Sequence, residues 1–123
     1  MSWFKKTNNT LASIVSRWKS QGVTLFVFER DNIIVLDSLI VPKGKRKQGI
    51  GSQIMRELTE YADTVGKRLE LSPGNKDPYH GTTSRKRLID FYKRFGLIQN
   101  KGRHKDYRTR ETMYREPTND INH

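Results

Sequence analysis

The chain has 123 residues, carries a formal net charge of +11 at pH 7 and is 33% hydrophobic. This length suits one hydrophobic core, so we expect a single domain over residues 1–115 and a polar tail over residues 116–123. The absence of cysteine excludes disulfides, thiolate metal sites and cysteine nucleophiles, and three scattered histidines show no metal-ligand spacing. Without an apolar run of about 18 residues or a signal-peptide pattern, the sequence predicts a soluble, cytoplasmic protein with no membrane partner.

The first half of the chain alternates between helix and strand patterns. Thr10 is a good N-cap for a helix that stops before Gly22, and residues 23–28 and 33–41 are β-branched and aromatic runs typical of a hairpin. A second helix is predicted over residues 50–65, before a glycine stop. Apolar residues recur at helical spacing in both helices: Leu11, Ile14, Val15 and Trp18, then Ile50, Ile54, Leu58, Tyr61, Ala62 and Val65.

The second half continues with shorter elements. Residues 68–71 form a predicted buried strand, and a polar loop follows to about residue 83. A further helix ends at Gly96, and short strands over residues 97–98 and 111–114 are expected to pair. The order α-β-β-α-β-α-β-β predicts a mixed α/β fold in which helices flank a central, mostly antiparallel sheet.

A basic, glycine-containing loop joins the strand that ends near Val41 to the following helix. It reads Arg46-Lys47-Gln48-Gly49-Ile50-Gly51, followed by Ser52. Glycines let the backbone approach a ligand closely, and the free amides at a helix N-terminus favour a phosphate. A dinucleotide fingerprint lacks its third glycine here and a P-loop lacks its Gly-Lys-Ser/Thr ending, so a different pyrophosphate site is expected. Alone, the pattern also suits an ordinary loop-to-helix turn.

A second motif lies downstream and reads Phe91-Tyr92-Lys93-Arg94-Phe95-Gly96-Leu97. With the Arg-x-x-Gly-x-Gly loop before it, in this order, it resembles the paired signatures of the GNAT superfamily of N-acetyltransferases over residues 23–115. The resemblance implies a GNAT-like fold and transfer of an acetyl group from acetyl-CoA to a primary amine by direct attack in a ternary complex. It also implies these cofactor-binding residues: Leu39, Ile40, Val41, Arg46, Lys47, Gln48, Gly49, Ile50, Gly51, Ser52 and Arg85.

The resemblance also implies catalytic roles for two side chains. Tyr92 matches the family's tyrosine that protonates the departing CoA thiolate, although a tyrosine on an apolar helix face can also be simply a core residue. Asp37 is the carboxylate of the central strand and stands roughly where many relatives carry an acid; a surface role suits it equally. Relatives that lack a base deprotonate the amine through water. A backbone amide near Val41 is implied as the oxyanion donor.

Three features depart from the family pattern. Arg85 occupies the place where relatives usually carry an asparagine. The segment between Leu71 and Tyr92 is longer than usual and contains Pro73, Asn75, Tyr79 and His80, of which the histidine is a weak candidate base. The N-terminal part has one clear helix where the family often has a strand and two helices.

The charge leaves a second hypothesis open. The loop over residues 100–110 mixes cations with Tyr107, a composition suited to phosphate contacts and stacking, although a solvated hairpin loop also explains it. A non-catalytic basic α/β module would bind nucleic acid or an acidic protein through residues 43–47 and 85–110. The surplus charge also suits an acceptor associated with nucleic acid, a ribosomal assembly or an acidic protein, and a homodimer stays open.

Overall fold

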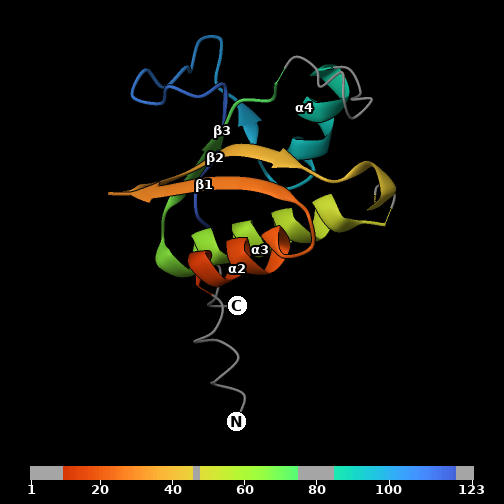
Figure 1. Ribbon diagram of the computed structural model, residues 1–123. Coiled ribbons are helices and arrows are strands. Elements are labelled where there is room, and N and C mark those ends of the chain that lie inside the picture. Colours follow the sequence, from red (N-terminus) through yellow and green to blue (C-terminus); the bar gives the residue numbers. More distant parts are fainter. Residues whose placement is uncertain (1–9, 46–47, 75–84, 119–123) are drawn as a thin grey trace.

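The computed structural model describes residues 10–45, 48–74 and 85–118, which form one sheet with helices on both of its sides (Figure 1). In chain order, the elements are α2 (Leu11–Lys19), β1 (Thr24–Arg30), β2 (Ile33–Ile40), the 3-10 turn η1 (Lys43–Lys45), α3 (Ile50–Val65), β3 (Arg68–Leu71), α4 (Arg85–Lys93), β4 (Ile98–Gln99) and β5 (Met113–Arg115). The predicted α-β-β-α-β-α-β-β order and the mixed α/β class are confirmed.

The five strands lie in the order β1-β2-β3-β5-β4. β2 and β3 are parallel and joined by α3, whereas the other neighbouring pairs are antiparallel. One face of the sheet carries the apolar core, because alternate strand residues point to the same side. Its side chains are at most 4% exposed: Leu25, Ile34, Leu36, Leu69, Leu71 and Met113.

Helices α2 and α3 cover this face together (Figure 1). The Thr10 hydroxyl accepts a hydrogen bond from the Ser13 amide at 3.1 Å, which caps α2 as the sequence predicts. Trp18 of α2 is buried, and its indole N–H donates to Glu57 of α3 at 2.9 Å. At the far end of α3, Gly66 adopts a left-handed φ of 69° and closes the helix.

Helix α4 lies on the other side of the sheet (Figure 1). Gly96 follows it with φ 91°, a left-handed conformation that turns the chain into β4. A Cβ at Gly96 would approach the Arg115 side chain to 2.9 Å, so this position has no room for a side chain unless Arg115 moves. The backbone conformation and the nearby Arg115 therefore explain why the second motif has glycine at this position.

Element ends differ from the predictions by one or two residues, as expected for frayed ends. Of the predicted polar tail, the structure describes residues 116–118. Glu116 pairs with Arg68, and Thr118 donates two hydrogen bonds to Asp63, each 2.9 Å long. Residues 116–118 are therefore attached to the domain. Within the described ranges, no helix combines the length and the apolar character needed to cross a bilayer.

Candidate active site

Strands β2 and β3 separate at their carboxyl ends. They pair only over residues 33–36 and 68–71; beyond this point residues 38–40 of β2 stay paired with β1 alone. After Leu71 the chain leaves the sheet through Ser72 and Pro73. In the described part of the chain, no strand covers the β3 side of this last stretch of β2. An extended ligand could pair with this edge as an added strand would.

Helix α3 begins at the same edge of the sheet. Its N-cap, Gly49, has φ 76°, which favours glycine, and no side chain of the described residues caps the helix. A Cβ at Gly49 would meet no atom within 4 Å among the described residues, so space is open in front of the first turn. The unpaired amides and the positive end of the helix dipole make this a favourable place for an anion.

The two sequence motifs meet at this helix end. A Cβ placed on Gly51 of α3 would lie 3.5 Å from the ring of Phe91 of α4, an ordinary van der Waals distance, so the two helices lie close together at this point. Phe91 in turn makes edge-on ring contacts with Tyr92 and Phe95, with both centroid distances 5.2 Å. The sequence shows the motifs only as separate segments; the fold joins them.

Tyr92 is buried, with only 8% of its surface exposed. Burial raises the pKa of its phenol to about 12. Among the described residues, its hydroxyl has no hydrogen-bond partner. The phenol therefore carries its proton at neutral pH, as an ordinary tyrosine does, but burial makes it a weaker acid than a tyrosine in water.

The other predicted side chains vary in how far the structure places them. Asp37 is the extra residue of a β-bulge, since Phe26 pairs with Ser38 and Val27 with Leu36, and its side chain is exposed. It lies on β2 where β3 departs. Arg85 is exposed at the first residue of α4, two turns before Tyr92 on the same helix.

Several predicted residues lie at the end of β2, in the connection that follows and in the first turn of α3. Leu39, Ile40 and Val41 are half-buried, and Gln48 is exposed. Ile50 is buried at the start of α3, with Ser52 half-buried in its first turn. Arg46, Lys47 and His80 lie outside the described residues.

Glu70 was missed by sequence reasoning. It lies on β3, only 4% exposed, on the sheet face opposite the core, and burial raises the pKa of its carboxyl. The Thr109 hydroxyl donates to it at 3.3 Å. An acidic residue in the middle of a short buried strand was the available signal.

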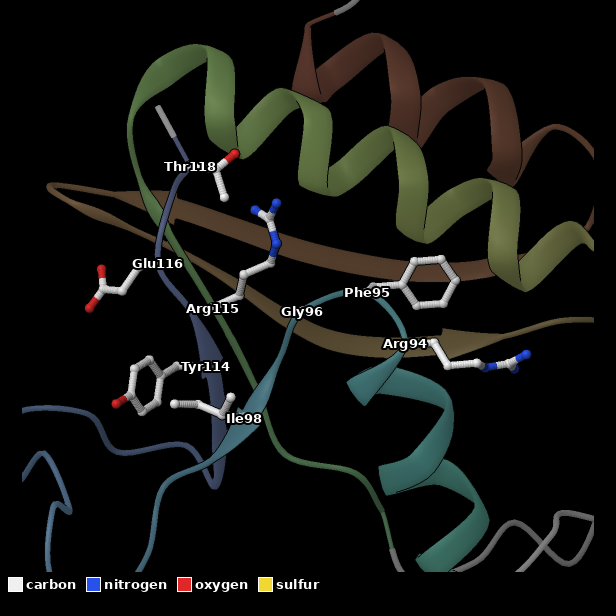
Figure 2. Close-up of a pocket in the computed structure, with 8 residues that line it drawn as sticks. All are labelled: Arg94, Phe95, Gly96, Ile98, Tyr114, Arg115, Glu116 and Thr118. Atoms are coloured by element: carbon white, nitrogen blue, oxygen red, sulfur yellow. The ribbon is translucent and has the colours of Figure 1, made fainter. Parts of the chain in front are cut away.

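Two hollows in the described surface lie elsewhere, and no sequence-predicted site residue lines either of them. One, of about 590 Å³, is shown in Figure 2, where Arg115 points toward Thr118. It is lined by Arg94, Phe95, Gly96, Ile98, Tyr114, Arg115, Glu116 and Thr118. The other, of about 570 Å³, lies between α2 and β1. The described residues contain no cluster of histidine and acidic side chains that could hold a metal ion.

Comparison with known proteins identifies the family and the fold. The family model of the GNAT acetyltransferases matches residues 2–97, so the chain belongs to this family. The fold is similar to that of a putative N-acetyltransferase from Lactobacillus plantarum, with a TM-score of 0.53 and 18% identity over 78% of the chain. The chain spans 60% of the length of that protein. A search of curated proteins found no match.

Proposed function

We propose that the chain transfers an acetyl group from acetyl-CoA to a primary amine, by direct attack in a ternary complex. Membership of the acetyltransferase family supports acetyl transfer. The observation that carries the proposal is the proximity of Gly51 to Phe91, which places the start of α3 next to the helix that holds Tyr92.

The residues present fit acetyl-CoA in three ways. Gly49 leaves open space before an uncapped helix N-terminus, where a pyrophosphate would accept hydrogen bonds from the amides of Ile50, Gly51 and Ser52. Arg46, Lys47 and Gln48 are the neighbouring polar side chains in the sequence. The edge of β2 at Leu39 and Ile40, which no described strand covers, would pair with the amide groups of the pantetheine arm, next to Val41; Arg85 would contact the same arm.

Acetyl-CoA, when bound, supplies an acetyl group activated as a thioester. Tyr92 would then donate its proton to the departing sulfur; the buried phenol is protonated at neutral pH, and its raised pKa means that the developing thiolate must be basic enough to take this proton. A backbone amide near Val41 would donate to the carbonyl oxygen as negative charge develops. Asp37 is the candidate that accepts a proton from the attacking amine, directly or through water; its exposed position at the bulge allows an acceptor to reach it.

Calorimetric titration with acetyl-CoA tests the proposal. We expect saturable binding by the wild-type chain and its loss in Gly49→Glu, because a carboxylate side chain would repel phosphate in front of α3. The absence of saturable binding by the wild type would refute the proposed function and favour the alternative of a non-catalytic basic module.

A matched control separates blockage from backbone strain. Gly66 closes the opposite end of α3, also with a left-handed φ, and a Cβ there would also meet no atom within 4 Å. Gly66→Glu therefore imposes a similar strain and the same charge change without approaching the proposed phosphate site. If both variants bind acetyl-CoA equally, the pyrophosphate lies elsewhere.

A further inference from the structure

The basic loop, residues 100–110, leaves the sheet at the same edge as the candidate active site. β3 and β4 are both antiparallel to β5 and so run in the same direction, which brings their carboxyl ends to one edge. The Thr112 amide donates to the Ser72 hydroxyl at 2.9 Å, and this hydroxyl donates to Glu111 at 2.8 Å. Figure 1 shows the loop, in blue, on the opposite side of the sheet from α2 and α3.

Despite its charge, the basic loop has a defined internal structure. Asn100 is 7% exposed, and its side-chain amide donates to the backbone carbonyls of Asp106 and Thr109 at 3.0 and 3.4 Å. Its side-chain oxygen accepts from the Asp106 amide at 2.8 Å. One buried asparagine therefore satisfies the backbone across the loop and fixes its shape.

A second set of contacts fixes the loop to β3. Arg68 pairs with Asp106 at 3.1 Å and donates to the Thr109 hydroxyl, which in turn contacts Glu70. Hydrogen bonds from Arg108, with a further contribution from Arg68, hold the pKa of the Asp106 carboxyl well below its usual range. The carboxylate of Asp106 is thus paired with arginine side chains of the protein itself.

In the described part of the chain, four exposed cations of the loop are not held in ion pairs of this kind. Lys101, Arg103, Lys105 and Arg110 are exposed, and in the described residues none of them has a carboxylate partner. Tyr107 is 84% exposed, with the Lys105 ammonium 5.3 Å from its ring centroid. Proteins that bind single-stranded nucleic acids combine exposed aromatic rings, on which bases stack, with cations that contact the phosphates. The basic loop presents both on a fixed backbone.

We propose that the basic loop is a docking surface for single-stranded nucleic acid. An acidic peptide would use the cations but would offer no planar base to Tyr107, so the exposed ring favours nucleic acid. The loop leaves the sheet at the edge where β2 and β3 separate. An amine carried on or beside the bound strand would then be the acceptor, and this part of the inference rests on the proposed function. The binding itself does not depend on acetyl transfer.

Fluorescence anisotropy with a labelled oligouridylate of about 12 nucleotides tests the surface. The variant Lys101→Gln/Arg103→Gln/Lys105→Gln should weaken binding at least about tenfold at low salt. It should also reduce the steepness of the salt dependence by about 2, because each lost phosphate contact on a single strand contributes about 0.7.

The charge-matched control is Lys19→Gln/Arg30→Gln/Arg56→Gln, which removes three exposed cations from α2, β1 and α3. It should leave affinity close to the wild-type value. If this control weakens binding as much as the loop variant does, or if the wild type does not bind RNA, the proposal is wrong.

Tyr107 provides a test that net charge cannot imitate. Tyr107→Ala should weaken RNA binding about tenfold through lost stacking, whereas Tyr107→Phe should retain the wild-type affinity. A polyglutamate peptide of equal length that binds as tightly as the RNA would overturn the assignment to nucleic acid. All loop variants should bind acetyl-CoA normally in calorimetry, so failure of this proposal and failure of the proposed function are separate results.

Discussion

At the scale of single residues, burial determines the protonation state of Tyr92. The aromatic ring packs against Phe91, and desolvation disfavours the phenolate, which raises the pKa to about 12. The same burial would make Tyr92 a poor base near neutral pH. Its hydroxyl, without a partner among the described residues, is consistent with a proton that is held for a reacting group.

Replacement of this hydroxyl should slow the reaction without preventing binding. We expect Tyr92→Phe to lower kcat about 10²-fold while the calorimetric Kd for acetyl-CoA is unchanged, because a general acid acts in the transition state. Thiol release with an excess of a simple primary amine measures the rate. Tyr61→Phe is the control: Tyr61 also has its pKa raised to about 12, but its hydroxyl donates to Glu29 at 2.7 Å. Equal rates in both variants would reduce Tyr92 to a core residue.

The raised pKa of Tyr92 also predicts how stability depends on alkaline pH. The folded phenol titrates near 12 and the unfolded one near 10, so below pH 10 neither state has lost this proton. Between these values only the unfolded state ionises, so the free energy of unfolding should fall by about 1.4 kcal/mol per pH unit relative to Tyr92→Phe. Denaturant titrations of both proteins measure the difference. Parallel stability curves from pH 10 to 12 would contradict the buried, protonated phenol.

At the scale of elements, glycines and apolar periodicity allowed helices and strands to be predicted from the sequence. Gly49, Gly66 and Gly96 all adopt positive φ, and each marks a helix end that was predicted at or next to its position. Helix α3 was predicted over the range observed because its apolar residues repeat along one face and Gly66 closes it. β3 was likewise placed over residues 68–71, although it is only four residues long.

Other features depend on tertiary contacts that no local pattern contains. The bulge at Asp37 arises from the register between β1 and β2, and a single strand does not reveal it. The shape of the basic loop depends on burial of Asn100, which looks like an ordinary loop residue in the sequence. The proximity of Gly51 to Phe91 requires two helices to pack close together. Motif residues were therefore predictable, but their arrangement in space was not.

At the scale of the whole molecule, the sheet separates two surfaces of different character. α2 and α3 close the apolar core on one side, while α4 and the basic loop lie on the other (Figure 1). The chain carries +11 net charge, and the basic loop contributes five lysine and arginine residues against one aspartate. A CoA molecule needs few of these cations, so the excess charge is more consistent with a polyanionic partner.

The end of the chain provides a test of where the domain stops. The sequence predicts a boundary at residue 115, yet Thr118 donates two hydrogen bonds to Asp63 at the end of α3, and Glu116 pairs with Arg68. Deletion of residues 116–123 should lower the free energy of unfolding by about 1–3 kcal/mol, because Asp63 would lose partners while it stays partly buried. Chemical denaturation measures the change.

Deletion of residues 119–123 alone is the control, because it keeps both contacts and so separates their effect from that of the last five residues. Burial opposes ionisation of Asp63, but hydrogen bonds from Arg115 and Thr118 outweigh it and lower the pKa of this carboxyl. A lowered pKa contributes stability above the unfolded value near 3.8, and this contribution is lost as pH falls through the folded value. The effect of the longer deletion should therefore shrink in acid. If deletion of residues 116–123 does not change stability at pH 7, the domain ends at residue 115, as the sequence predicts.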